Sequence, residues 1–167
     1  MTEDVSLIPA AARARIGTET GRAQGRVVRQ EFQRWAAAVK DRNPLYFDAD
    51  FARSQGYRDV VMPPLYITAV TAGVADLDAL RPDGIPGAGP GDVPLPLTPR
   101  VMGGGESFQF HQPVYDGDVL TSVRVIENIE EKHGRSGPFV LVTSRTTYTR
   151  QDGTTVAEAV TRTIARP

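Results

Sequence analysis

The most informative pattern in this chain lies at residues 40–75, KDRNPLYFDADFARSQGYRDVVMPPLYITAVTAGVA. Polar side chains cluster near its start, and residues 60–75 then form a run without a single charge. From Leu65 onward, every face of a helix built from this run is apolar or small, which is typical of a buried helix. The pattern therefore predicts a buried helix over residues 65–75, with polar side chains beside its start.

The segment before this stretch is expected to form an amphipathic helix. Apolar residues recur there at helical spacing, on one face: Phe32, Trp35, Ala36 and Val39. We expect this helix to deliver the chain to Asp41 and to stop before Pro44, because the residue that precedes a proline avoids helical geometry.

The polar cluster contains side chains that can bond to or exchange protons with a ligand: Asp41, Asn43, Tyr46 and Asp48. Each also has an ordinary structural role. Asp48 is suited to cap a short helix over residues 49–55, with Gly56 as its stop. Asp41 before Asn-Pro is suited to a turn, and Tyr46 to packing as a buried aromatic residue.

Beyond residue 100 the apolar pattern changes to a period of two, which indicates strands. The expected strands cover residues 107–112, 119–127, 139–150 and 155–165, with connections at 115–118, 131–138 and 151–154. The Asp152-Gly153 pair predicts a tight hairpin. Helices followed by strands indicate an α+β fold, in which the apolar helix packs against the concave face of an antiparallel sheet.

The composition excludes several classes of function. The chain has 167 residues, no cysteine, and a net charge of −1 from 19 basic and 20 acidic residues. Disulfides and thiolate metal sites are thus excluded, and we expect no nucleic-acid or membrane partner. The two histidines lack partners at metal-ligand spacing, so no metal or cofactor is expected. The start of the chain does not resemble a secretory signal, which favours a cytoplasmic protein.

Two segments stand apart from the expected core. Residues 1–25 show weak periodicity and glycines at 17, 21 and 25, which predicts an irregular lead-in with one helical turn at 10–15. Residues 81–99 are rich in proline and glycine and are expected to form a long loop. The length is that of one domain, so we expect residues 1–167 to form a single unit.

Several short motifs occur in a characteristic order: DRNPLY (41–46), GY (56–57), VMPP (61–64), FQFHQPV (108–114), GD (117–118) and YTRQDG (148–153). In this order and spacing they resemble the MaoC-like dehydratases. The resemblance is to the N-terminal-type branch found in (3R)-hydroxyacyl-thioester dehydratases and enoyl-CoA hydratases. It implies a hot-dog fold, in which an antiparallel sheet wraps around a central helix.

The resemblance also implies a chemistry. Catalytically competent members carry the motif Asp-x-Asn-Pro-x-His, whose aspartate and histidine bind a water and move a proton at the double bond beside a thioester carbonyl. Asp41 and Asn43 match this motif, but Tyr46 occupies the histidine position. A phenol has a pKa of about 10, against about 6.5 for imidazole, so Tyr46 is a poor proton shuttle at neutral pH.

The carbonyl oxygen in the family is bound by a backbone amide at the start of the central helix. The corresponding residues here are the expected substrate-binding residues: Pro63, Pro64, Leu65 and Tyr66. Pro64 stands where hydratases commonly have glycine, and proline has no amide hydrogen to donate. Leu65 still has one.

Some members of this family are heteromers in which one chain keeps the aspartate–histidine pair and the other lines the substrate tunnel. The sequence resembles the second kind of subunit, with an acyl-CoA or acyl-carrier-protein thioester as its ligand. Two alternatives remain open. The chain could form a self-sufficient homodimeric hydratase that uses Asp41, or a non-catalytic module that binds an acyl thioester.

Overall fold

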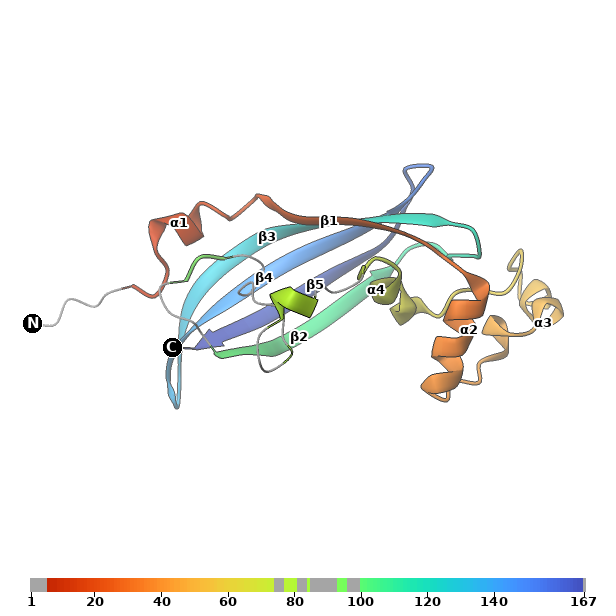
Figure 1. Cartoon of the computed structure of the whole chain (residues 1–167), viewed down its shortest axis with the longest axis horizontal. Coiled ribbons are helices and arrows are strands. Elements are labelled where there is room, and N and C mark those ends of the chain that lie inside the picture. Colours follow the sequence, from red (N-terminus) through yellow and green to blue (C-terminus); the bar gives the residue numbers. More distant parts are fainter. Residues whose placement is uncertain (1–5, 74–76, 81–83, 85–92, 96–99, 167) are drawn as a thin grey trace, which may run out of the picture.

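An antiparallel sheet forms the body of the protein (Figure 1). The computed structural model describes residues 6–73, 77–80, 84, 93–95 and 100–166. Among these, five strands pair in the order β1-β3-β4-β5-β2, with every pair antiparallel. The strands are β1 (Glu19–Arg26), β2 (Arg100–Phe110), β3 (Val119–Gly134), β4 (Gly137–Arg150) and β5 (Thr155–Arg166). The α+β class and the antiparallel sheet are thus as the sequence predicts.

All of strand β1 except its last residue, Arg26, falls within residues 1–25, which were expected to form an irregular lead-in. It pairs with β3, so that Gly21 lies opposite Arg124, Ala23 opposite Ser122 and Gly25 opposite Leu120. If this segment is considered as a helix, its glycines predict interruptions of that helix. In a strand, however, Gly21, Ala23 and Gly25 form a row of small residues on one face, because alternate residues share a face.

The prediction of a connection at residues 131–138 is also wrong. Strand β3 continues to Gly134 and β4 starts at Gly137, with only two residues between them. Gly137 has a φ of 102°, which a tight turn can use because glycine has no side chain. The hairpin predicted at Asp152-Gly153 is confirmed, and Gly153 donates to the carbonyl of Arg150 at 2.9 Å.

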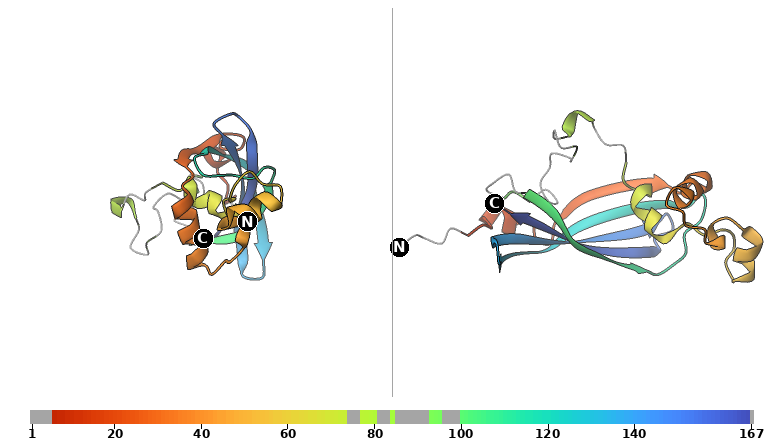
Figure 2. Two further views of the ribbon diagram at one scale, coloured as in Figure 1. Left: turned by 90° about the vertical axis from the view of Figure 1, so that its right-hand side faces the viewer. Right: turned by 90° about the horizontal axis from the view of Figure 1, so that it is seen from below.

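The helices are short and gather mainly at one end of the sheet (Figure 2). They are α1 (Ala10–Arg13), α2 (Arg29–Ala38), η1 (Pro44–Tyr46), α3 (Ala49–Ser54), η2 (Pro64–Tyr66), α4 (Ile67–Val70) and η3 (Leu77–Ala79). Helix α2 ends earlier than expected, and Val39 is 54% exposed rather than on the buried face. Asp48 caps α3 as predicted, because its side chain accepts from the amides of Asp50 and Phe51.

The central helix is shorter than the expected 65–75 and is not buried on all sides. Helix α4 covers only Ile67–Val70, and Leu65 on the preceding turn is 53% exposed. The sheet covers one side of this segment, so its apolar composition does not translate into burial all round. Gly73 has a φ of 68° and lies beyond the end of the helix. Residues 74–76 lie outside the described residues.

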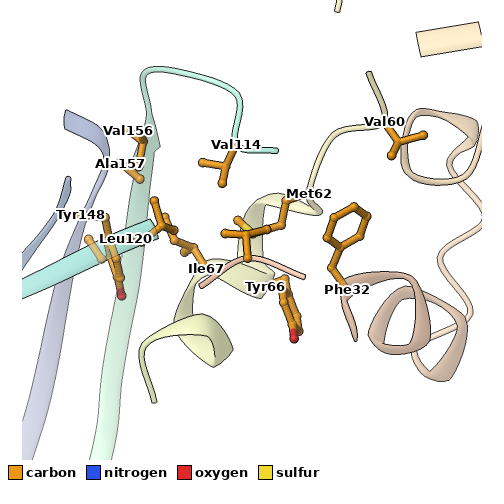
Figure 3. Packing of buried hydrophobic residues seen from close by; sticks show 12 residues of the cluster. Phe32, Val60, Met62, Tyr66, Ile67, Val114, Leu120, Tyr148, Val156 and Ala157 are labelled. Atoms are coloured by element: carbon orange, nitrogen blue, oxygen red, sulfur yellow. The ribbon is translucent and has the colours of Figure 1, made fainter. Parts of the chain in front are cut away.

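Apolar residues from α2, the α4 region and the sheet form the main core. Figure 3 shows Met62, Tyr66 and Ile67 between Phe32 of α2 and Leu120 of β3. A second buried cluster lies under β3, β4 and β5 and includes Ile8, Ala12 and Val93. No helix in the described part of the chain is long and apolar enough to cross a membrane.

Val93 and its neighbours 94–95 belong to the proline- and glycine-rich segment at 81–99. Residue 84 is the only other described residue of that segment, and the rest of the predicted loop lies outside the described residues.

Candidate functional site

Residues 41–46, which we call the polar turn, hold their polar side chains together through local hydrogen bonds. The Asp41 carboxylate accepts from the amide of Asn43 at 3.0 Å, and the Asn43 side-chain oxygen accepts from the amide of Leu45 at 3.1 Å. Asn43 thereby caps η1, whose first residue is Pro44. The structure thus brings Asp41 and Asn43 into one turn, as the sequence predicts, but each side chain has a backbone partner there.

Tyr46 ends this turn and is buried, with 8% of its surface exposed. Burial raises the pKa of its phenol above the ordinary value, and the negative charge of Asp41 raises it further. A hydrogen bond with the Asn43 side chain acts in the opposite direction. The phenol therefore stays protonated at neutral pH and cannot serve as a base there.

The turn before α4 borders a different cavity. This apolar pocket has a volume of about 270 Å³. It is lined by Tyr57, Val61, Met62, Pro64, Ile67, Phe110, His111, Gln112, Pro113, Val114 and Val156. Aliphatic and aromatic groups predominate among these residues, and the polar side chains are few, which suits an apolar ligand with one polar end.

A backbone amide without a partner in the described part of the chain lies at the same turn. Pro64 has no amide hydrogen, whereas none of the described residues accepts a hydrogen bond from the Leu65 amide. Pro63 is almost fully buried and leads the chain into the turn. Tyr66 points the other way and packs against Trp35, with ring centroids 5.7 Å apart. Of the four expected binding residues, only Pro64 lines the apolar pocket.

The polar turn and the apolar pocket are neighbours but not one cavity. The carbonyl of Leu45 accepts from the amide of Val61 at 2.9 Å, which ties the two segments together. Asp41 lines a separate cavity of about 270 Å³ with Ala37, Lys40, Arg42 and Phe47. Within the described residues of a single chain, the expected catalytic residues therefore do not face the expected substrate pocket.

His111, one of the two histidines without a partner at metal-ligand spacing, lines the apolar pocket. Its Nε2 atom lies 3.2 Å from a carboxylate oxygen of Glu158, which also pairs with Arg145. The signal was the FQFHQPV segment, of which five consecutive residues, 110–114, line the pocket from the last residue of β2 onward. The alternating apolar pattern predicts that Phe108 and Phe110 share one face of a strand. It does not predict that the segment also lies beside α4.

The comparisons with known proteins agree on the family. Residues 14–159 match the family model described as FAS1-like, dehydratase domain region. A UPF0336 protein of Streptomyces avermitilis is 33% identical over 84% of this chain and 84% of its own length. A UPF0336 protein of Mycobacterium leprae is 30% identical over 81% of this chain and 73% of its own length.

Solved structures show the same fold. The ChsH1–ChsH2 complex from Mycobacterium tuberculosis matches with a TM-score of 0.72 at 20% identity, over 94% of this chain and 89% of the matched chain. The HadBC (3R-hydroxyacyl-ACP dehydratase) complex from the same organism matches with a TM-score of 0.64 at 26% identity, over 90% and 96%. The (R)-hydratase from A. caviae matches with a TM-score of 0.61 at 20% identity, over 91% and 96%. The predicted hot-dog fold is confirmed.

Proposed function

Because the chain belongs to the FAS1-like dehydratase domain region family, we propose that it is the substrate-shaping subunit of an enoyl-CoA hydratase or 3-hydroxyacyl-thioester dehydratase. It acts beside a second hot-dog chain that supplies the acid–base pair. Its ligand is an acyl thioester of coenzyme A or of an acyl carrier protein.

The state of Tyr46 carries this proposal. Its phenol replaces the motif histidine, is buried, and has a pKa raised above the ordinary value. Water addition next to a thioester requires a group that both takes up and releases a proton near neutral pH. Since Tyr46 cannot do this and Asp41 is engaged in its own turn, a partner that supplies a histidine completes the chemistry.

The apolar pocket gives this chain a role in such a complex. Its apolar walls suit an acyl chain, and the amide of Leu65 at the turn before α4, which has no partner among the described residues, suits the thioester oxygen. Asp41, Asn43 and Tyr46 then shape the turn that leads to this pocket and do not transfer protons themselves.

The known structures support a two-chain arrangement. ChsH1–ChsH2 and HadBC are complexes of two named chains, and both resemble this protein over nearly its whole length. HadBC is described as a 3R-hydroxyacyl-ACP dehydratase. The binding partner we propose is therefore a different hot-dog chain that carries the histidine, whereas pairing with a second copy, which also has Tyr46, belongs to the homodimeric alternative.

Hydration of crotonyl-CoA by the purified chain, alone and mixed with a hot-dog chain that carries an intact Asp-x-Asn-Pro-x-His motif, tests the proposal. We expect turnover only in the mixture. Asp41→Asn in this chain should change that rate by less than about twofold, because the carboxamide oxygen can still accept from the Asn43 amide. Asp50→Asn, a change to an exposed aspartate on α3, is the matched control.

Two results would contradict the proposal. Full turnover by the lone chain that is lost in Asp41→Asn would show a self-sufficient homodimeric hydratase. Tight binding of acyl-CoA without turnover in any mixture would show a non-catalytic binding module.

A further inference from the structure

A polar cleft of about 310 Å³ lies on the inner face of the sheet, on the β1 side of α4. We call it the polar cleft and define it by its lining residues: Gly21, Arg22, Ala23, Thr71, Ala72, Ser122, Arg124, Thr146 and Tyr148. It shares no lining residue with the apolar pocket or with the cavity beside Asp41. Neither the family resemblance nor the proposed function uses these residues.

Small residues on β1 keep the cleft open. At Gly21, an added Cβ atom would lie 3.5 Å from Nη2 of Arg124, so the guanidinium lies directly over this glycine. At Gly25, an added Cβ atom would lie only 1.8 Å from the carbonyl oxygen of Val70, so β1 holds the end of α4 in backbone contact. Thr71, which follows α4, thereby reaches the cleft.

The cleft contains hydroxyl groups that have no hydrogen-bond partner among the described residues. Tyr148 is only 6% exposed, yet its hydroxyl makes no hydrogen bond to any described residue. Figure 3 shows its ring packed in the core cluster while the hydroxyl points out of that cluster. Thr71 is 9% exposed and its hydroxyl also has no partner among the described residues. The two hydroxyl oxygens are not among the fully buried unpartnered atoms, so they are accessible from the cleft and can bond to a ligand there.

The charges of the cleft favour an anion. Arg124 forms no ion pair within the described part of the chain, and no acidic side chain lines the cleft. The second guanidinium, on Arg22, is bound by Glu19 at 2.8 Å. The nearby Glu106 accepts a hydrogen bond from Thr161 and does not line the cleft.

From these groups we infer that the polar cleft binds the carboxylate group of a small organic molecule. A guanidinium presents two parallel N–H donors that match the two oxygens of a carboxylate. The Tyr148 and Thr71 hydroxyls can donate to the same oxygens. The volume is at the lower end of the range for small-molecule sites, which suits a short organic acid.

Two sources can provide this carboxylate: a free organic acid, or the far end of an acyl chain whose thioester lies at the start of α4. Ile67 lines the apolar pocket and Thr71 lines the polar cleft. Four residues of helix separate them, a rise of roughly 6 Å. The second source rests on the proposed function, whereas the first does not.

Isothermal titration calorimetry of the full chain at low ionic strength tests the inference in two arms. The first compares glutarate with its neutral analogue glutaramide, and the second compares glutaryl-CoA with pentanoyl-CoA. We expect the carboxylate to bind at least tenfold more tightly in one or both arms. Arg124→Gln should weaken that binding at least tenfold, and Tyr148→Phe roughly threefold to tenfold.

Matched variants keep the result interpretable. Tyr148→Phe retains the buried ring and loses no hydrogen bond within the described chain, so it should fold like the wild type. Arg22→Gln removes a guanidinium of the same rim that is already bound by Glu19, and should change affinity by less than about twofold. The free-acid arm contains no thioester and no partner chain, so its outcome is independent of the hydratase proposal.

Three outcomes would overturn the inference. One is equal binding of carboxylate and neutral ligand in both arms. Another is wild-type affinity in both Arg124→Gln and Tyr148→Phe. The third is an equal loss of affinity in Arg22→Gln, which would reveal only a diffuse positive rim.

Discussion

The polar turn and the polar cleft both contain hydroxyl and charged groups beside the core, but they use them differently. In the polar turn, the side chains of Asp41 and Asn43 accept from backbone amides two residues further along the chain. In the polar cleft, the hydroxyls of Tyr148 and Thr71 have no partner among the described residues.

This difference follows from how each region is built. The turn is one continuous segment, so its short polar side chains reach their own backbone. The cleft is assembled from β1, the end of α4, β3 and β4, and neighbouring strands already satisfy the backbone groups there. Its side chains are left available. In the polar turn, the side chains whose types suggest catalysis stabilise the local backbone. In the polar cleft, side chains of ordinary strand residues remain available to a ligand.

The largest expected effect comes from Gly25→Ala, which disturbs the contact between β1 and the end of α4 beside the polar cleft. The new Cβ atom meets the Val70 carbonyl at 1.8 Å, and two backbone segments cannot move apart cheaply. We expect a loss of about 3 kcal/mol in the free energy of unfolding, measured by urea denaturation.

Gly21→Ala is the control for this change, on the same strand and the same face. Its Cβ atom meets only the flexible end of Arg124, at the ordinary contact distance of 3.5 Å. The expected change is within about 0.5 kcal/mol. Similar losses in both variants would mean that neither glycine position of β1 tolerates a Cβ atom, whether or not it contacts α4.

A smaller effect separates the two tyrosines. Tyr46→Phe removes a hydroxyl that interacts with the Asn43 side chain and should cost about 1 kcal/mol in the free energy of unfolding at neutral pH. Tyr148→Phe removes a hydroxyl without a partner among the described residues and should change it by less than about 0.5 kcal/mol. Chemical denaturation measures both. Equal losses would show that the Tyr148 hydroxyl is bonded within the protein.

Both phenylalanine variants should also differ from the wild type in how their stability responds to alkaline pH. Burial raises the pKa of both Tyr46 and Tyr148 above that of a phenol in the unfolded chain. Above pH of about 10 the unfolded chain ionises first. The stability from these groups is therefore complete below that pH and is lost as pH rises through the raised values. Each phenylalanine variant should lose less stability than the wild type between neutral and alkaline pH.

Local sequence signals predicted the local features correctly. The Asp48 cap, the hairpin at Asp152-Gly153 and the turn that gathers Asp41 with Asn43 all depend on residues a few positions apart. The antiparallel sheet followed from the period of two. These features were predictable because the partners that stabilise them are neighbours in the chain.

Features that depend on distant partners were missed. An uncharged run suggested a helix buried on all sides, but the extent of burial at α4 depends on where the sheet lies. The small size of Gly21, Ala23 and Gly25 in a strand is explained only by the contact between Gly25 and the end of α4, which the sequence does not reveal. Likewise, Arg124 and Tyr148 are ordinary strand residues in the sequence, and only the pairing of β3 with β4 and β1 brings them to one cleft.

The smallest expected effect concerns Lys40, at the entry to the polar turn. Its φ of 60° lies in the left-handed region, and it follows the end of α2. The amides of Lys40 and Asp41 bond back to the carbonyls of Ala37 and Ala36, at 3.1 and 2.9 Å, a helix-ending pattern that usually has glycine at this position. Lys40→Gly should therefore raise the free energy of unfolding by about 0.5 kcal/mol.

Lys40→Ala separates this backbone effect from the loss of charge, because alanine removes the ammonium group but keeps the strain. Urea denaturation should show a gain for glycine and none for alanine, with glutarate binding unchanged in both. Equal gains would assign the effect to charge. A change in glutarate affinity would mean that the polar turn and the polar cleft are coupled through α2, and the two regions would then no longer be separate structural units.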